Sequence, residues 1–148
     1  CIPVDPHYLS WLARRHDFET SFITLSAQVN EQMPFYVANA VVEAIAKQPV
    51  RLQDANVLVL GTAFKKNVDD TRHAPARTVV RLLREKGIEQ ICFADPHVES
   101  FRVDTGQGAI EVPRVELTDE GLDAHDVAVL VTDHDDFPYD TIRERLAA

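Results

Sequence analysis

Three cationic side chains follow a buried stretch of the sequence at a spacing that suits phosphate binding. Lys65 and Lys66 come directly after the apolar run 56–61, and Arg72 stands just before a helix that is expected to start near Pro75. Lysine supplies a mobile point charge, arginine a planar fork of donors, and the start of a helix a set of aimed backbone N–H groups. Such a combination is suited to holding a diphosphate.

The same cations have an ordinary alternative. Asp69 and Asp70 lie between Lys66 and Arg72, so the segment could be a solvated loop in which opposite charges pair with one another. The spacing by itself leaves both interpretations open.

Cys1 has the chemistry of a nucleophile, and Asp5 follows it four residues later. A cysteine in a loop before a helix can be held as a thiolate, and a nearby carboxylate can orient a water molecule or a proton. The alternative is that Cys1 merely marks where the chain begins. Cys92 lies inside an apolar run and is expected to be a buried structural thiol. Two cysteines so far apart indicate no disulfide framework, which favours a reducing, cytoplasmic setting.

The run 133–136 (Asp-His-Asp-Asp) offers possible metal ligands, but no HExxH motif and no Cys/His pairing at zinc spacing accompanies it. Acidic residues also suit the N-terminus of a helix. We therefore expect this run to cap the last helix, and we expect no metal site.

Gly61 ends its apolar run without the usual dinucleotide fingerprint. Thr62 and Ala63 follow it, and no further glycine precedes the next expected helix, so the GxGxxG pattern is absent. Such a turn can serve one nucleotide, but it is a poor site for NAD.

Three apolar runs predict the strands that position these residues. They cover residues 56–61, 90–96 and 127–132. Each is a continuous aliphatic stretch of the kind found in buried parallel strands. Helices are expected over about 75–86 and 138–146. The alternation indicates an α/β fold with a Rossmann-like parallel sheet, in which ligands bind at the carboxyl ends of the strands.

A long amphipathic helix is expected before this α/β part. Apolar residues recur every three or four positions from about Ser21 to Lys47, and Pro34 should kink the helix. Little sequence is available to cover the apolar face, so we expect a partner, either another domain or a second subunit. The chain thus divides into a helical segment, residues 1–49, and an α/β domain, residues 50–148.

The overall charge restricts the possible partners. The 148 residues carry a formal net charge of -9 at pH 7. Binding to nucleic acid or to an anionic membrane surface needs clustered cations, so this charge argues against both. No apolar run reaches the roughly 18–20 residues that span a bilayer. The phosphates of an anionic ligand must therefore be met locally.

Three motifs resemble those of the nucleotide-sugar dehydrogenases, in the same order and at similar spacing. Residues 1–9 (CIPVDPHYL) are similar to the catalytic-cysteine motif of that family. Residues 29–34 (VNEQMP) are similar to its central-helix signature, and residues 57–75 resemble the entry to its UDP-binding domain. The resemblance covers most of the chain and indicates the C-terminal portion of such an enzyme.

The resemblance implies an NAD-dependent UDP-sugar 6-dehydrogenase. In this family an aldehyde forms at C6 of the sugar, a thiolate that corresponds to Cys1 attacks it, and oxidation leaves a thioester that water hydrolyses. Asp5 matches the carboxylate that assists the water. Phe64 and Lys65 match a pair that contacts the substrate, and Arg72 matches an arginine of the same loop, which contacts the substrate or has a structural role.

The position before Asp5 bears on the substrate. It is Val4 here, whereas family members that act on UDP-glucose usually carry lysine, so the resemblance implies a UDP-N-acetylhexosamine. It also implies a role in polysaccharide biosynthesis and a homo-oligomer formed through the central helix. The family's NAD-binding domain is missing from this sequence, so the chain alone is expected to be inactive. The alternative function is a stand-alone nucleotide-binding α/β module without catalysis.

Overall fold

The computed structural model describes residues 4–106 and 108–146. Its elements, in chain order, are α1 (Asp5–Arg14), α2 (Ser21–Ile45), the 3-10 helix η1 (Leu52–Asp54), β1 (Asn56–Leu60), α3 (Pro75–Glu85), β2 (Gln90–Ala94), β3 (Phe101–Asp104), β4 (Ala109–Val112), α4 (Asp119–Asp123), β5 (Val127–Leu130) and α5 (Tyr139–Leu146).

β1 is the central strand of a three-stranded parallel sheet with the order β2-β1-β5. Val57 of β1 pairs with Ile91 on one side and with Val127 on the other. After β2 the chain crosses to the opposite side of β1 to form β5, so the winding direction reverses beside the carboxyl end of β1. Ligands in such folds bind at this switch point. The prediction of an α/β fold with a parallel sheet is confirmed.

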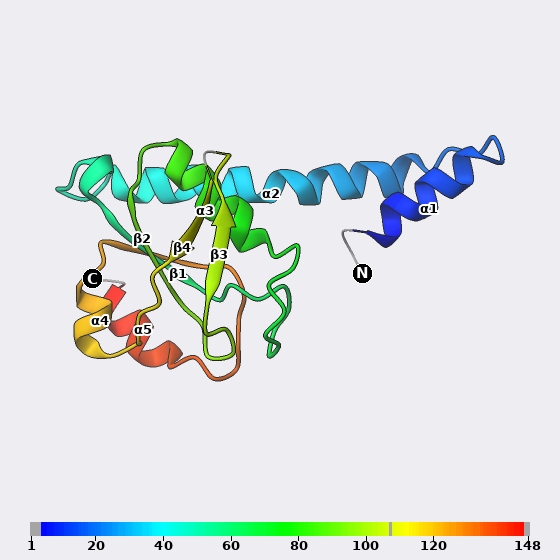
Figure 1. Cartoon of the computed structure of the whole chain (residues 1–148). Coiled ribbons are helices and arrows are strands. Elements are labelled where there is room, and N and C mark those ends of the chain that lie inside the picture. The colour runs from blue at the N-terminus through cyan, green and yellow to red at the C-terminus, as the bar shows by residue number, and fades with distance from the viewer. Residues whose placement is uncertain (1–3, 107, 147–148) are drawn as a thin grey trace.

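Helices cover both faces of the sheet, which explains why β1 is apolar throughout (Figure 1). Neighbouring side chains of a strand point to opposite faces. Val57 and Val59 accordingly belong to the core under α2 and α3, while Leu58 and Leu60 belong to a second core with residues of α4 and α5.

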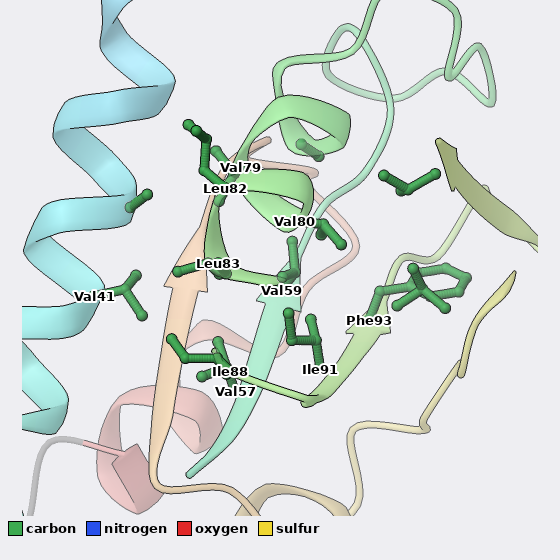
Figure 2. Packing of buried hydrophobic residues seen from close by; sticks show 14 of the residues in the cluster. Val41, Val57, Val59, Val79, Val80, Leu82, Leu83, Ile88, Ile91 and Phe93 are labelled. Carbon is green, nitrogen blue, oxygen red and sulfur yellow. The ribbon is translucent and has the colours of Figure 1, made fainter. Parts of the chain in front are cut away.

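α3 is held by a stripe of buried residues at helical spacing. The stripe consists of Ala76, Val79, Val80, Leu82 and Leu83. Pro75 begins the helix, where its missing N–H costs nothing, and Gly87 follows its end with a φ of 92°. Figure 2 shows this stripe facing the strands and Val41 of α2.

α2 has two dissimilar halves. It continues unbroken through the buried Pro34, and its C-terminal half packs on α3 with Ala38, Val41 and Ile45 buried. Its N-terminal half extends beyond the sheet, and α1 folds back along it (Figure 1). The Thr20 hydroxyl donates to the Ser10 hydroxyl at 2.7 Å where the two helices meet.

Four short elements were not predicted: the 3-10 helix η1, the two strands of the antiparallel hairpin β3–β4, and the single turn of α4. β3 alternates buried Phe101 and Val103 with exposed Arg102 and Asp104, as expected for a strand with one covered face. In the described part of the chain, no helix is long and apolar enough to cross a membrane.

Candidate functional site

The site is built where the segments that follow β1 and β5 pass close to each other. Gly61 follows β1 with a φ of 77°, and a Cβ atom placed on it would lie 2.1 Å from the Thr132 carbonyl oxygen. Only glycine fits such an approach. The Thr132 hydroxyl donates to the Ala63 carbonyl at 2.7 Å, which fixes the start of the loop that follows.

That loop, residues 61–74, carries the three predicted substrate-binding residues. The Phe64 N–H donates to the Asp70 carbonyl at 2.7 Å, so the loop closes on itself. Lys65 is exposed, and its Nζ lies 5.6 Å from the centroid of the half-buried Phe64 ring. Among the described residues, no carboxylate pairs with Lys65. Lys65 therefore presents an unneutralised charge next to an aromatic ring.

The other two cations of the loop are already paired. Lys66 Nζ lies 2.5 Å from Asp135 Oδ1, and the hydrogen bond to Asp135 raises the pKa of Lys66 above its usual value. Arg72 binds Asp70 through two side-chain bonds, Nε to Oδ1 at 3.0 Å and Nη2 to Oδ2 at 2.8 Å. These bonds lower the pKa of Asp70 to about 2. For Lys66 and Arg72, the arrangement is the one expected of a solvated loop with paired charges.

The acidic run 133–136 does not cap α5, because Pro138 immediately precedes its first residue, Tyr139. The residues of this run instead form hydrogen bonds and an ion pair with the loop after β1. Asp135 accepts a bond of 2.7 Å from the Asn67 side-chain amide in addition to its pair with Lys66, while the side chain of His134 is completely buried. Within the described residues, no three His, Cys, Asp or Glu side chains are grouped as a metal site.

A buried carboxylate connects the ends of β1 and β2. The two oxygens of Asp95 accept four backbone N–H groups, those of Thr62 at 2.6 Å, Ala63 at 3.2 Å, His97 at 2.9 Å and Val98 at 3.0 Å. Burial raises the pKa of Asp95, but the backbone donors outweigh burial and leave the pKa below its usual value. The carboxylate is thus held in its charged form beneath the loop.

Of the two residues predicted for catalysis, the structure describes only Asp5. Cys1 is outside the described residues. Asp5 is exposed and begins α1, and in the described part of the chain no hydrogen bond or ion pair joins it to the loop of Phe64, Lys65 and Arg72. Cys92 is half-buried in β2, and burial raises the pKa of its thiol, which suits a structural cysteine.

A groove of about 550 Å³ lies between α2, the start of α3 and the end of β5. The motif of residues 29–34 lines one wall through Asn30, Glu31, Met33 and Pro34. The end of the motif of residues 57–75 lines the facing wall. Two motifs that are distant in the sequence therefore border one hollow.

Sequence reasoning missed the buried pair formed by Asp95 and His134, whose facing side-chain atoms are 3.1 Å apart. The available signal was the position of each residue, one or a few residues after a buried strand. In a parallel sheet such positions converge at one edge.

Comparisons with known proteins agree with this geometry. Residues 58–148 match the UDP-glucose/GDP-mannose dehydrogenase family, UDP binding domain. UDP-N-acetyl-D-mannosamine dehydrogenase of Methanococcus maripaludis is 31% identical over 137 residues, which covers 93% of this chain and 28% of that protein. UDP-N-acetyl-D-glucosamine 6-dehydrogenase of Pseudomonas aeruginosa is 34% identical over 100 residues, which covers 68% of this chain and 24% of that protein.

The fold comparison covers nearly the whole chain. The solved structure of a UDP-D-ManNAc dehydrogenase from Pyrococcus horikoshii superposes with a TM-score of 0.73 at 25% identity, over 98% of this chain and 31% of that chain. The chain thus spans less than a third of the length of these relatives. Its resemblance to nucleotide-sugar dehydrogenases is confirmed. With a match that covers more than half of its residues, the chain belongs to the UDP-glucose/GDP-mannose dehydrogenase family, whose UDP-binding domain occupies residues 58–148.

Proposed function

We propose that this chain is the C-terminal part of an NAD-dependent UDP-sugar 6-dehydrogenase that oxidises the C6 alcohol of a UDP-hexose to the uronic acid. Family membership and the order of the three motifs support this proposal. In it, residues 1–49 form the catalytic-cysteine loop and the central helical segment, and residues 50–148 form the UDP-binding domain.

The observation that carries the proposal is the unpaired charge of Lys65 at the switch point of the sheet. Of the three loop cations, Lys66 is bound to Asp135 and Arg72 to Asp70. Lys65 stays available to meet the diphosphate of UDP, with the Phe64 ring beside it. Arg72 then acts by shaping the loop through Asp70.

The substrate class we propose is a UDP-N-acetylhexosamine. Two relatives are named for UDP-N-acetyl-D-mannosamine and UDP-N-acetyl-D-glucosamine. Val4, in the position where the UDP-glucose enzymes of the family usually carry lysine, favours the same class.

The chemistry we propose passes through a thioester on Cys1. The Cys1 thiolate adds to the C6 aldehyde, and after oxidation of the adduct, water oriented by Asp5 breaks the C–S bond, so that the carboxylate leaves and the thiolate is restored. NAD would accept the hydrides. The turn after Gly61 lacks the dinucleotide fingerprint, so it is a poor site for NAD. In this proposal the NAD site belongs to another part of the protein.

Two further features complete the proposal. A homo-oligomer forms through α2, and the protein works in the cytoplasm in polysaccharide biosynthesis. The chain by itself binds ligand without turnover, and steady formation of NADH from a UDP-N-acetylhexosamine and NAD would contradict this.

The test is calorimetric titration of the chain with UDP, with Lys65→Ala beside the wild type. Loss of one charge-assisted contact should weaken UDP binding about tenfold. Lys86→Ala, which removes an exposed lysine after the far end of α3, is the matched control and should bind like the wild type. Equal affinity of Lys65→Ala and the wild type would remove Lys65 from the site. A wild-type chain that does not bind UDP would contradict the proposal that this segment holds the nucleotide.

A further inference from the structure

One imidazole ring joins the ends of the three parallel strands. His134 follows β5, and its Nε2 lies 3.1 Å from Oδ2 of Asp95, which follows β2. Its Nδ1 accepts the backbone N–H of Asn67, in the loop after β1, at 2.9 Å. The side chains of His134 and Asp95 are both completely buried.

The hydrogen bonds of the His134 ring determine which of its nitrogens carries the proton. Because Nδ1 accepts the Asn67 N–H, the ring proton lies on Nε2, and Nε2–H donates to Asp95. Both ring nitrogens are thus satisfied. The ring of Phe137 packs edge-on against the imidazole at a centroid distance of 5.5 Å, and the Tyr139 hydroxyl donates to the His134 carbonyl at 2.8 Å. The imidazole therefore has a fixed position and orientation.

The turn at Asn67, which His134 holds, has a backbone conformation that is unfavourable without such an anchor. Asn67 has a φ of 58°, a left-handed conformation that asparagine tolerates and most residues avoid. Asn67 is exposed, and it stands two residues after Lys65. A bond from a buried ring to the Asn67 N–H fixes this exposed turn to the core of the sheet.

We propose that His134 is a positioning residue for Lys65, acting through the Asn67 backbone N–H, so that the Lys65 ammonium group stands where a diphosphate binds at the carboxyl ends of the strands. This inference rests on the proposed function, since it takes the ligand of Lys65 to be the diphosphate of UDP. His134 itself is buried beneath the loop and does not touch the ligand. An apolar side chain could fill the same space in the core, but it could bind neither the Asn67 N–H nor Asp95, as the two ring nitrogens of His134 do.

Two substitutions separate the two nitrogens. His134→Asn places an amide oxygen near the position of Nδ1 and can still accept the Asn67 N–H, but it cannot reach Asp95. His134→Gln places an amide nitrogen near the position of Nε2 and can still donate to Asp95, but it leaves the Asn67 N–H without its acceptor. His134→Asn loses the buried bond to the Asp95 carboxylate, and His134→Gln loses the part-buried bond from the Asn67 N–H. The free energy of unfolding, measured with urea, should therefore fall at least as far in His134→Asn as in His134→Gln, so weaker UDP binding by His134→Gln cannot be ascribed to a less stable fold.

The experiment titrates both variants and the wild-type chain with UDP and follows hydrogen exchange at the Asn67 amide. We expect His134→Gln to bind UDP about tenfold more weakly than the wild type and His134→Asn to bind within about threefold of it. We expect the Asn67 amide to exchange at least about tenfold faster in His134→Gln than in His134→Asn.

The outcomes separate this inference from the proposed function. If the wild type binds UDP and both variants bind it equally, His134 does not position Lys65 and the inference is overturned. If the wild type does not bind UDP, the proposed function fails, and with it the assignment of a diphosphate to Lys65. In that case faster Asn67 exchange in His134→Gln still supports the anchoring of the turn, and equal exchange overturns it as well.

Discussion

At the scale of single residues, charge pairing decides which cations of the loop are available to a ligand. Lys66 and Arg72 each have a carboxylate partner, whereas Lys65 has an aromatic ring beside it. In a chain of net charge -9, a cation without a partner is the group that can attract an anionic ligand. The sequence could place all three cations in one loop, but it could not show which of them were paired.

The pairing of Asp70 with Arg72 leads to a prediction about pH. Hydrogen bonds from Arg72 lower the pKa of Asp70 from 3.8 to about 2 in the folded chain. A lowered folded-state pKa stabilises the fold fully above pH 3.8, and this contribution is lost as the pH falls towards 2. An NMR titration of the Asp70 carboxyl carbon should therefore have its midpoint near 2 in the wild type, and Arg72→Gln should return it towards 3.8.

A matched control exists in Arg102→Gln, because Arg102 pairs with Glu111 on the hairpin of β3 and β4 instead. This variant should leave the Asp70 midpoint unchanged. An Asp70 midpoint that stays low in Arg72→Gln would show that another group holds the charge.

At the scale of secondary-structure elements, the three parallel strands were the most predictable part of the fold. The run 56–61 is apolar because helices cover both faces of β1, and that pattern is visible in the sequence. The run 127–132 does form a parallel strand, but the expectation that it is buried was wrong: β5 is an edge strand with half-buried residues, and Leu130 is 48% exposed. The hairpin of β3 and β4 was missed because each strand has four residues and only one covered face, which leaves little periodicity to detect. His134 was misassigned because its partners lie 39 and 67 residues away in the chain.

Gly61 is tightly constrained because the turn after β1 passes directly against Thr132, which follows β5. Gly61→Ala should destabilise the chain by about 3 kcal/mol or more, because the added methyl group overlaps the Thr132 carbonyl in addition to straining the backbone. Gly87→Ala has a similar backbone, with a φ of 92°, but open space around the new atom. That control should cost about 1 kcal/mol, the backbone strain alone.

Urea unfolding followed by circular dichroism measures both free energies. If the two variants lost the same stability, the contact between Gly61 and Thr132 would not be as tight as the structure has it.

At the scale of the whole molecule, the two halves of α2 differ in what covers them. The C-terminal half shares the main core with α3, whereas the N-terminal half leaves large apolar side chains in contact with solvent. Phe22 is 86% exposed, Leu25 55% and Val29 54%, and they recur at helical spacing. A contiguous apolar surface of this kind marks an interface.

This apolar surface of α2 is where we expect the proposed homo-oligomer to form. In sedimentation velocity the wild-type chain should behave as a dimer, and Leu25→Glu should behave as a monomer, because a carboxylate in the centre of the interface would have to be buried without a partner. Gln48→Glu introduces the same charge at an exposed position beyond the end of α2 and should remain a dimer. Circular dichroism should show the same helix content in all three proteins, because Leu25 is exposed and its replacement removes no core contact. A wild type that sediments as a monomer at every concentration would instead assign this apolar surface to another part of the same protein, and the oligomer proposal would fall while the UDP site was untouched.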